Sequence, residues 1–438
     1  MKFSNFSNHF NQDSGILRLM NDLGHALNLD QEIYMLGGGN PAAIPQIEVC
    51  YRAEMIRLLE NGNQFEKMVG NYDPPQGNQR FIEVLAELLN DTCGWSVTSK
   101  NIAITNGSQA SFGILFNLFA GQFADRTSKK ILLPMTPEYI GYNDVGLNES
   151  EIFRANRPVI QIDKDDRLFF KYQVDFSAID IDDECGAICV SRPTNPTGNV
   201  ITDTELTKLN QLAKQASIPL ILDGAYGLPF PGIIFTDAMP VWDGHMVLCL
   251  SLSKLGLPGV RTGIVIADAE IIDMITRCNA IFNLSPGRFG PSLLTRLVKN
   301  KDLISLCDTI IKPYYKLRVD QAVNLVREYM SDLPVRVHKP EGAMFLWLWF
   351  EGLPGTCETL YQNLKKRGVY IISGSHFFPG LKENWEHKLQ CIRVSYAGNE
   401  KQVEQGLKII AQVVRAAYQG AHHEAARIKA VRIKAAKA

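Results

Sequence analysis

The sequence lacks an apolar run long enough to cross a membrane. Its longest one, AMFLWLWF, covers residues 343–350, whereas a spanning helix needs about 20 residues. The N-terminus, MKFSNFSNHFNQDSG, has no apolar core followed by a small-residue cleavage site, so it does not look like a secretion signal. We therefore expect a protein without a membrane segment or a membrane partner.

The sequence also lacks an excess of charge and a pattern of paired cysteines. Its net charge is −1 at pH 7, so no overall field attracts nucleic acid. The nine cysteines are odd in number and include no C-x-x-C pair, which argues against a disulfide framework and against a metal site. The C-terminal stretch 421–438 is basic, and we interpret it as a solvated helix rather than a nucleic-acid arm. We expect reduced thiols, a cytoplasmic location, no bound metal and no nucleic-acid partner.

What the sequence has is enough apolar residues, 46% of 438, for a large core and two domains. Between about residues 100 and 267, short apolar runs alternate with helical stretches. Apolar residues at consecutive positions are typical of strands covered by helices on both faces, so we predict a largely parallel α/β sheet. The predicted strands are NIAIT (101–105), ILLP (131–134), GAICVS (186–191), IPLILD (218–223), MVLCLS (246–251) and TGIVIA (262–267).

Helix signals fill the gaps, and the pattern changes toward the C-terminus. Thr202 and Glu205 form a T-x-x-E capping box at the start of one predicted helix, and residues 79–90 have amphipathic spacing. After about residue 305 come longer helices, a hairpin-like region at 340–350 and a helix from about residue 400. We therefore predict a large domain over 61–304 and a smaller domain that combines 1–60 with 305–438.

Polar residues follow the predicted strands where ligands bind in open parallel sheets, beyond the carboxyl ends. Ser108 follows the first strand; it is either an ordinary helix cap or, beside a glycine, part of an anion site. Tyr139 and Tyr142 follow the second, where a tyrosine packs in the core or stacks on a flat ring. Asn195 follows the third, in a loop whose turn chemistry alone explains its residues.

The next two strands end in charged groups. Asp223 ends a strongly apolar strand, where a carboxylate needs a cation or several donors. Lys254 follows the next strand, with Arg261 seven residues on. This lysine is either a solvated side chain or a desolvated amine able to form a Schiff base. Each stretch alone is weakly specific, but their coincidence at one edge of the sheet predicts a binding site.

Three motifs in this order connect the chain to a known family. They are N-P-T-G at 195–198, D-x-A-Y at 223–226 and S-x-S-K-x-x-x-P-G-x-R-x-G at 251–263. Together they resemble the fold-type I pyridoxal-phosphate enzymes and, within them, the class I/II aminotransferases, over residues 36–396. The resemblance implies a large domain with a mostly parallel, seven-stranded sheet flanked by helices, a smaller α+β domain, and pyridoxal 5'-phosphate as the cofactor.

The resemblance also implies roles for single residues. Lys254 resembles the lysine that binds the cofactor covalently and moves the proton, and Asp223 the carboxylate that faces the pyridine nitrogen. Tyr226 and Asn195 resemble donors to the ring hydroxyl oxygen, and Tyr139 the ring that stacks on the cofactor. The residues that resemble the phosphate cup are Ser108, Gln109, Ser251, Ser253 and Arg261.

Further roles concern the substrate and a second subunit. Tyr72 resembles the tyrosine that reaches the phosphate of the partner subunit, which implies a homodimer with shared active sites. Arg393 resembles the arginine that binds the substrate carboxylate, helped by the backbone at Gly38 and Gly39 and by Asn195. From the sequence alone, Arg393 in an internal salt bridge is the alternative.

The motifs GGGNPAAIP, NYDPPQG and SRPTNPTGNVIT narrow the likeness further. They imply transfer of the amino group of valine, or a similar aliphatic amino acid, to pyruvate, giving 2-oxoisovalerate and alanine in a ping-pong cycle, as in amino-acid biosynthesis. Candidate pocket residues are Ile16, Leu17 and Tyr34. Arg288 is interpreted as a surface charge, but it leaves dicarboxylate substrates open.

Other activities on the same kind of cofactor site also stay open. They are an aspartate or aromatic aminotransferase, a β-lyase or decarboxylase, and a cofactor-binding regulator. A lyase would form its product without any keto-acid acceptor. The regulator is disfavoured because fewer than 40 residues precede GGGN, too few for a DNA-binding domain and linker.

Overall fold

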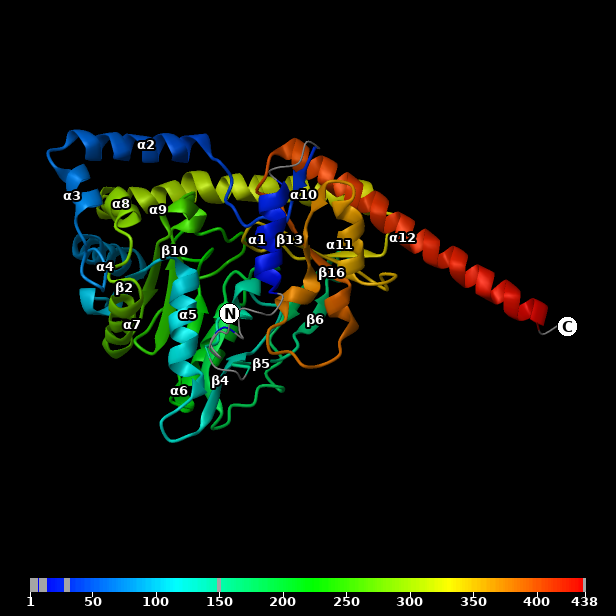
Figure 1. Ribbon diagram of the computed structural model, residues 1–438, viewed down its shortest axis with the longest axis horizontal. Coiled ribbons are helices and arrows are strands. Elements are labelled where there is room, and N and C mark those ends of the chain that lie inside the picture. Colours follow the sequence, from blue (N-terminus) through cyan, green and yellow to red (C-terminus); the bar gives the residue numbers. More distant parts are fainter. Residues whose placement is uncertain (1–6, 8–13, 27–31, 148–150, 436–438) are drawn as a thin grey trace.

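The six predicted strands lie in one mostly parallel sheet (Figure 1). The computed structural model describes residues 7, 14–26, 32–147 and 151–435. The strand order is β2-β11-β10-β9-β8-β4, with β5 and the two-residue β3 also beside β4. Neighbours are parallel except in the pairs β2–β11, β10–β11 and β3–β4. The strands are β2 (Ile102–Thr105), β3 (Gly121–Gln122), β4 (Ser128–Leu133), β5 (Phe153–Ala155), β8 (Cys185–Ser191), β9 (Leu220–Asp223), β10 (Met246–Ser251) and β11 (Gly263–Ile266).

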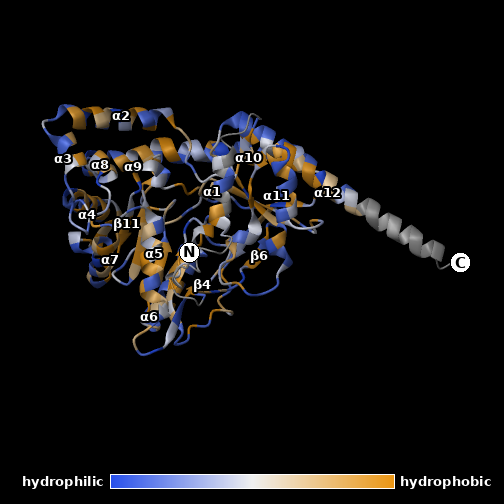
Figure 2. Cartoon of the chain, in the orientation of Figure 1, coloured by the Kyte–Doolittle hydropathy of each residue, from blue (hydrophilic) through white to orange (hydrophobic). Residues whose placement is uncertain are grey.

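Helices cover both faces of this sheet, which is why its central strands are buried throughout. Side chains of α5 and α7 form one apolar core with the sheet, and those of α4, α6 and α8 belong to the core on the other face. Figure 2 shows the apolar residues concentrated along these helices and strands. The predicted α/β class and mostly parallel sheet are confirmed, but the sheet has eight described strands instead of seven, because the two-residue β3 also pairs with β4. The helices are α4 (Gln79–Cys93), α5 (Ser108–Phe119), α6 (Asp203–Gln215), α7 (Ala269–Phe282) and α8 (Phe289–Lys299).

Two predicted helix starts had different outcomes. The capping box of α6 is present: Glu205 N donates to Thr202 Oγ1 at 3.1 Å, and Thr202 N donates to Glu205 Oε2 at 2.8 Å. The proposed cap at Ser108 is wrong, because α5 begins at Ser108 and the cap position belongs to Gly107. Gly107 has φ 90°, a backbone conformation that glycine adopts readily.

A second sheet has the order β15-β16-β13-β12-β7-β6. Its β12 and β13 are antiparallel, as the hairpin-like pattern predicts. β6 and β7 come from the middle of the chain and join through a parallel pairing of β7 with β12. The domain boundaries stay a prediction. The strands are β6 (Val159–Ile162), β7 (Phe169–Gln173), β12 (Val335–His338), β13 (Phe345–Phe350), β15 (Ile372–Ser373) and β16 (Cys391–Ser395).

The remaining elements pack beside both sheets: the helices over 45–60 and 64–70 contact α8 beside the first sheet, and the helix over 312–330 contacts β13 of the second. β1 (Tyr34–Met35) pairs with β14 (Val369–Tyr370), and α12 starts at the predicted position. The side chains of the basic stretch 422–438 lie outside the described residues. Within the described part of the chain, no helix has the length and hydropathy needed to cross a membrane. The α-helices among the remaining elements are α1 (Gly15–Ala26), α2 (Pro45–Glu60), α3 (Gln64–Gly70), α9 (Asp302–Leu306), α10 (Lys312–Met330), α11 (Cys357–Lys365) and α12 (Glu400–Ala435).

Candidate active site

Lys254 lies directly after β10, in a 3₁₀ turn over Ser253–Leu255. Its Nζ donates to the carbonyl oxygen of Gly39 at 2.7 Å and lies 5.2 Å from the ring centre of Tyr226. Burial and the charge of Arg393 lower the pKa of the amine to about 8, against the opposing effect of Asp223. A substantial fraction of this amine is therefore neutral at mildly alkaline pH.

Asp223 is the last residue of β9 and is buried. Tyr142 donates its hydroxyl to Asp223 Oδ2 at 2.6 Å, and the N–H of Ala225 donates to Oδ1 at 2.9 Å. Burial raises the pKa of Asp223, and these two hydrogen bonds act in the opposite direction. No ion pair joins this carboxylate to another described residue, so both of its hydrogen-bond donors are neutral. The charge of Lys254 acts on it without a direct contact.

Arg393 lies on β16 of the second sheet and is 2% exposed. Its Nη1 donates to Asn195 Oδ1 at 2.7 Å, and its Nη2 donates to the carbonyl oxygen of Gly37 at 2.6 Å. The guanidinium carbon lies 4.0 Å from the ring centre of Phe345. Burial lowers the pKa of Arg393 to about 10. The internal salt bridge does not form with any carboxylate in the described part of the chain.

Arg261 and the start of α5 form an anion cradle. The guanidinium of Arg261 lies so close to Gly107 that a Cβ there would be 2.3 Å from Nη2. A Cβ on Gly263 would be 2.7 Å from the backbone nitrogen of Ser108. Glycine is favoured at Gly107 by its φ of 90° and at Gly263 by the backbone atoms that a Cβ would meet. The first N–H groups of α5 thus lie beside an exposed guanidinium, an arrangement that favours a phosphate or carboxylate.

The other predicted cofactor residues lie around this edge. The hydroxyl oxygen of Ser251 accepts a hydrogen bond from Ser253 N at 3.1 Å. Gln109 donates to the carbonyl oxygen of Gly141 at 2.8 Å, and its own oxygen is buried without a hydrogen bond to a described residue. The ring of Tyr139 is half-buried and packs edge-on against Tyr142, with ring centres 5.5 Å apart. Tyr226 is buried, with its ring edge-on to Phe345.

The glycine run 37–39 brings the two halves of the site together. Gly37 contacts Arg393 and Gly39 contacts Lys254, so the half-buried Gly38 lies between two carbonyl groups that bind site cations. Lys254 and Arg393 come from different sheets. The backbone at Gly38 and Gly39 therefore lies between Lys254 and Arg393.

Other predicted residues form no hydrogen bond or ion pair with this group among the described residues. Tyr72 is 81% exposed, and Leu17 is also exposed. Ile16 and Tyr34 are half-buried against the main core. Arg288, which we interpret as a surface charge, is partly exposed, and its Nη2 pairs with Asp73 Oδ1 at 2.7 Å; Asp73 is a buried carboxylate that requires a cation.

Two residues of the PEYIGY stretch (137–142) make hydrogen bonds near the site that their sequence pattern does not predict. Tyr142 is the side-chain donor to Asp223. Glu138 is fully buried and accepts from Ser191 N at 2.9 Å and from the Ser191 hydroxyl. Burial raises the pKa of Glu138 to about 8. The only signal in the sequence was the position of this stretch after a predicted strand.

Comparisons with known proteins agree with this geometry. Residues 52–410 match the family described as aminotransferase class I and II. The valine–pyruvate aminotransferase of Escherichia coli is 49% identical over 96% of this chain and 100% of its own. The crystal structure of a putative amino-acid aminotransferase from Psychrobacter arcticum has a TM-score of 0.93, with 46% identity over 96% of this chain and 99% of its own.

A second solved structure, the valine-pyruvate aminotransferase of Salmonella typhimurium, has a TM-score of 0.84. It is 48% identical and is covered to 99%, over 92% of this chain. The family match spans most of the sequence and includes both halves of the site. This chain belongs to the class I and II aminotransferases, a family of pyridoxal-phosphate-dependent enzymes.

Proposed function

We propose that this protein transfers the α-amino group of valine, or of a similar aliphatic amino acid, to pyruvate, giving 2-oxoisovalerate and alanine in a ping-pong cycle. The observation that supports the transfer is the buried position of the Lys254 amine near Arg393 and Asp223. Burial and the charge of Arg393 lower its pKa to about 8. The choice of valine and pyruvate is supported by the 49% identity to the Escherichia coli enzyme of that name. We place the reaction in the cytoplasm and in amino-acid biosynthesis.

The residues at the strand ends fit pyridoxal phosphate. Asp223 is a buried carboxylate that lacks a cation among the described residues, as expected of a group that holds a protonated ring nitrogen. Arg261 and the start of α5 offer a phosphate cradle that a Cβ at Gly107 would fill. We assign Ser108, Gln109, Ser251 and Ser253 to the same cradle, and Tyr139 to the ring face.

The cofactor, when bound, supplies the electron-accepting ring that makes removal of the α-proton feasible. Lys254 would remove this proton from the substrate α-carbon and deliver it to the cofactor carbon that takes up the amino group, which requires a neutral amine. A pKa of about 8 leaves enough of that form near physiological pH. The carbonyl group of Gly39 holds the amine in place at 2.7 Å.

Arg393 binds the substrate carboxylate through two parallel hydrogen bonds, which fix the orientation of the α-carbon. Asn195 has a second role, because its Oδ1 is occupied by Arg393 and its Nδ2 has no hydrogen bond to a described residue. We assign Nδ2 and the hydroxyl of Tyr226 to the ring hydroxyl oxygen of the cofactor. One amide thus connects the substrate arginine to the cofactor.

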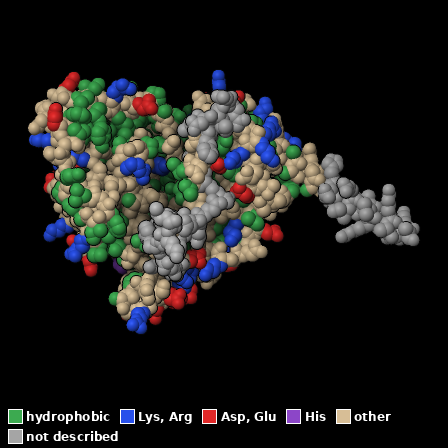
Figure 3. Space-filling model, viewed as in Figure 1, with side chains coloured by type: hydrophobic (Ala, Val, Ile, Leu, Met, Phe, Trp, Pro, Cys, Tyr) green, Lys and Arg blue, Asp and Glu red, His purple; other side chains and the backbone are tan. Residues whose placement is uncertain are grey.

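We also propose a homodimer with shared active sites. Tyr72 is the candidate to complete the partner's phosphate cradle, because it is 81% exposed and has no hydrogen bond to a described residue. Large apolar side chains are exposed on α2 (Val49, Ile56 and Leu59) and at the end of α7 (Ile281 and Phe282). Figure 3 shows hydrophobic side chains gathered over the α2 end. Patches of this kind mark subunit interfaces.

The test is a panel of amino donors with pyruvate, in which alanine formation is followed. Valine and similar aliphatic amino acids should give the highest kcat/KM. Aspartate as the best donor would contradict the proposed specificity. Product formation without any keto acid would identify a lyase instead.

A further inference from the structure

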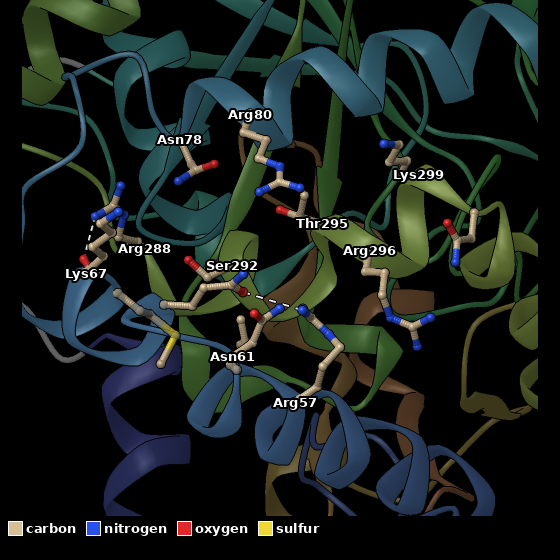
Figure 4. A pocket seen from close by; sticks show the side chains of 14 residues that line it. Arg57, Asn61, Lys67, Asn78, Arg80, Arg288, Ser292, Thr295, Arg296 and Lys299 are labelled. Carbon is tan, nitrogen blue, oxygen red and sulfur yellow. Dashed lines mark hydrogen bonds between the residues drawn. The ribbon is translucent and has the colours of Figure 1, made fainter.

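A cavity of about 460 Å³ lies between α2, α3, α4 and α8, separate from the candidate active site. It shares no lining residue with that site. Figure 4 shows side chains from these helices converging on it. Polar groups such as Ser292 and Asn61 form part of its lining. Its six basic residues are Arg57, Lys67, Arg80, Arg288, Arg296 and Lys299.

The two carboxylates beside the cavity, Glu54 and Asp73, balance only a third of this positive charge. Glu54 accepts from Arg57 Nε at 3.0 Å and from Arg296 Nε at 2.9 Å. Asp73 pairs with Arg288. The other three cations, Lys67, Arg80 and Lys299, form no ion pair with any residue that the structure describes. The cavity therefore concentrates uncompensated positive charge, which attracts an anion.

The position of Arg80 is not explained by the stability of its helix. α4 starts at Gln79, and its Asn78 cap accepts from the N–H of Phe81 at 3.0 Å. Arg80 is thus in the first turn, where a cation opposes the helix dipole. Lys299 is in the last turn of α8, where the dipole favours a cation. Figure 4 shows the guanidinium of Arg80 directed toward Thr295 and the cavity.

We propose that this cavity binds a small anion carrying a phosphoryl group and at least two negative charges. Its volume is that of a typical small-molecule site. Arg80 and Lys299 supply charge, and the hydroxyl of Ser292 and the amide of Asn61 supply hydrogen-bond donors. Arginine binds the oxygens of such a group in pairs, and lysine adds a compact charge.

The experiment uses the enzyme loaded with pyridoxal phosphate, so that the phosphate cradle of the active site is filled. Pyrophosphate is the probe, and its affinity is measured by titration calorimetry at low salt. The double variant R80Q/K299Q should bind it about ten- to a hundredfold more weakly, since each charged hydrogen bond contributes strongly. The control R126Q/K408Q removes the same charge at exposed positions outside the cavity and should bind as the unchanged enzyme does.

A second measurement separates binding from folding. R80Q alone should melt at the same or a higher temperature, because it removes a cation from the first turn of α4, and should still lose affinity for pyrophosphate. The proposal is overturned if pyrophosphate does not bind the loaded enzyme, or if both double variants bind it equally. Binding of citrate without pyrophosphate would overturn the assignment to phosphoryl groups. Loss of dimerisation in R80Q/K299Q, with no pyrophosphate binding to the unchanged enzyme, would assign the cavity to a second copy instead.

Discussion

Two buried arginines show how differently this fold treats the same side chain. Arg318 on α10 is 5% exposed, pairs with Glu400 at 2.8 Å and donates to the carbonyl oxygen of Gly398 at 2.6 Å. Arg393 is equally buried, yet its acceptors are one amide and one carbonyl group. Both lack an acceptor for Nε among the described residues. The two arginines therefore differ in one respect: Arg318 has a carboxylate partner, and Arg393 has none among the described residues.

This contrast separates a structural charge from a functional one. A buried guanidinium without a counter-charge is costly, so a fold keeps it only where another anion compensates. At Arg318 the chain supplies that anion itself. At Arg393 the substrate carboxylate of the proposed reaction would supply it, and the glycine run 37–39 connects this position to Lys254.

The largest effect is expected at the amine that shares the site with Arg393. Lys254→Ala removes the group that moves the proton, so kcat should fall by roughly 10⁴-fold or more. The visible absorbance of the covalently bound cofactor should be lost as well. Steady-state kinetics and absorbance spectra measure the two effects. Near-normal turnover, or borohydride labelling at another lysine, would remove Lys254 from its assigned role.

The comparison itself is tested by the pair Arg393→Lys and Arg318→Lys. A lysine cannot make two parallel hydrogen bonds, so R393K should lower kcat/KM for valine by about 10- to 100-fold. R318K is the matched control. It should lower stability and leave kcat/KM for valine nearly unchanged, because its partner is internal. Equal losses of kcat/KM in both variants would show that burial alone, not substrate binding, distinguishes Arg393.

A smaller effect is expected at Tyr142, which holds the other charge of the site. Tyr142→Phe removes the 2.6 Å hydrogen bond to Asp223, which holds the pKa of this carboxyl down against burial. The carboxylate should then hold a proton on the cofactor ring less firmly. We expect kcat to fall several-fold, roughly the effect of one hydrogen bond. A pH titration of cofactor absorbance should shift in Y142F, and an unchanged titration would assign Tyr142 to packing alone.

The smallest effect on catalysis is expected at Glu54, another charge that the chain pairs internally. Glu54→Gln should lower the free energy of unfolding by about 2 kcal/mol, less than for a fully buried pair because Arg296 is 45% exposed. Arg296 and Arg57 hold the pKa of Glu54 below its usual 4.5. Its stabilisation is thus complete above pH 4.5 and is lost as pH falls through the lowered pKa.

Urea unfolding at pH 7 and at pH 3 checks this prediction. The difference in the free energy of unfolding between E54Q and the unchanged protein should be smaller at pH 3 than at pH 7. The kcat for valine should be the same in both proteins at pH 7. If this difference in unfolding free energy does not depend on pH, the Glu54 side chain stabilises the protein by packing and not by its charge.

The sequence predicts the main sheet well because its strands are apolar at consecutive positions, a pattern that depends only on burial. It does not predict β6 and β7, whose residues alternate between more and less exposed positions. Their place is decided by pairing with β12, more than 160 residues away. Local patterns do not contain that information.

The same distinction applies to the site. Motifs predict which residue types lie at the strand ends, since parallel strands bring their carboxyl ends to one edge. The contact of Tyr142 with Asp223 and the pairing of Arg288 with Asp73 join distant parts of the chain. Both depend on how the elements pack. The cap at Ser108 was wrong for a local reason, because the turn at Gly107 takes the cap position.

The crossing of β6 and β7 into the second sheet affects how the protein can be divided. A fragment made only of residues 305–438 would leave one edge of β12 without its neighbour, a template for aggregation. Dissection or fusion of this enzyme should therefore keep 159–173 with the C-terminal strands. For the same reason, the sheet that bears Arg393 includes strands from the middle of the chain, so the C-terminal part alone cannot be exchanged between relatives.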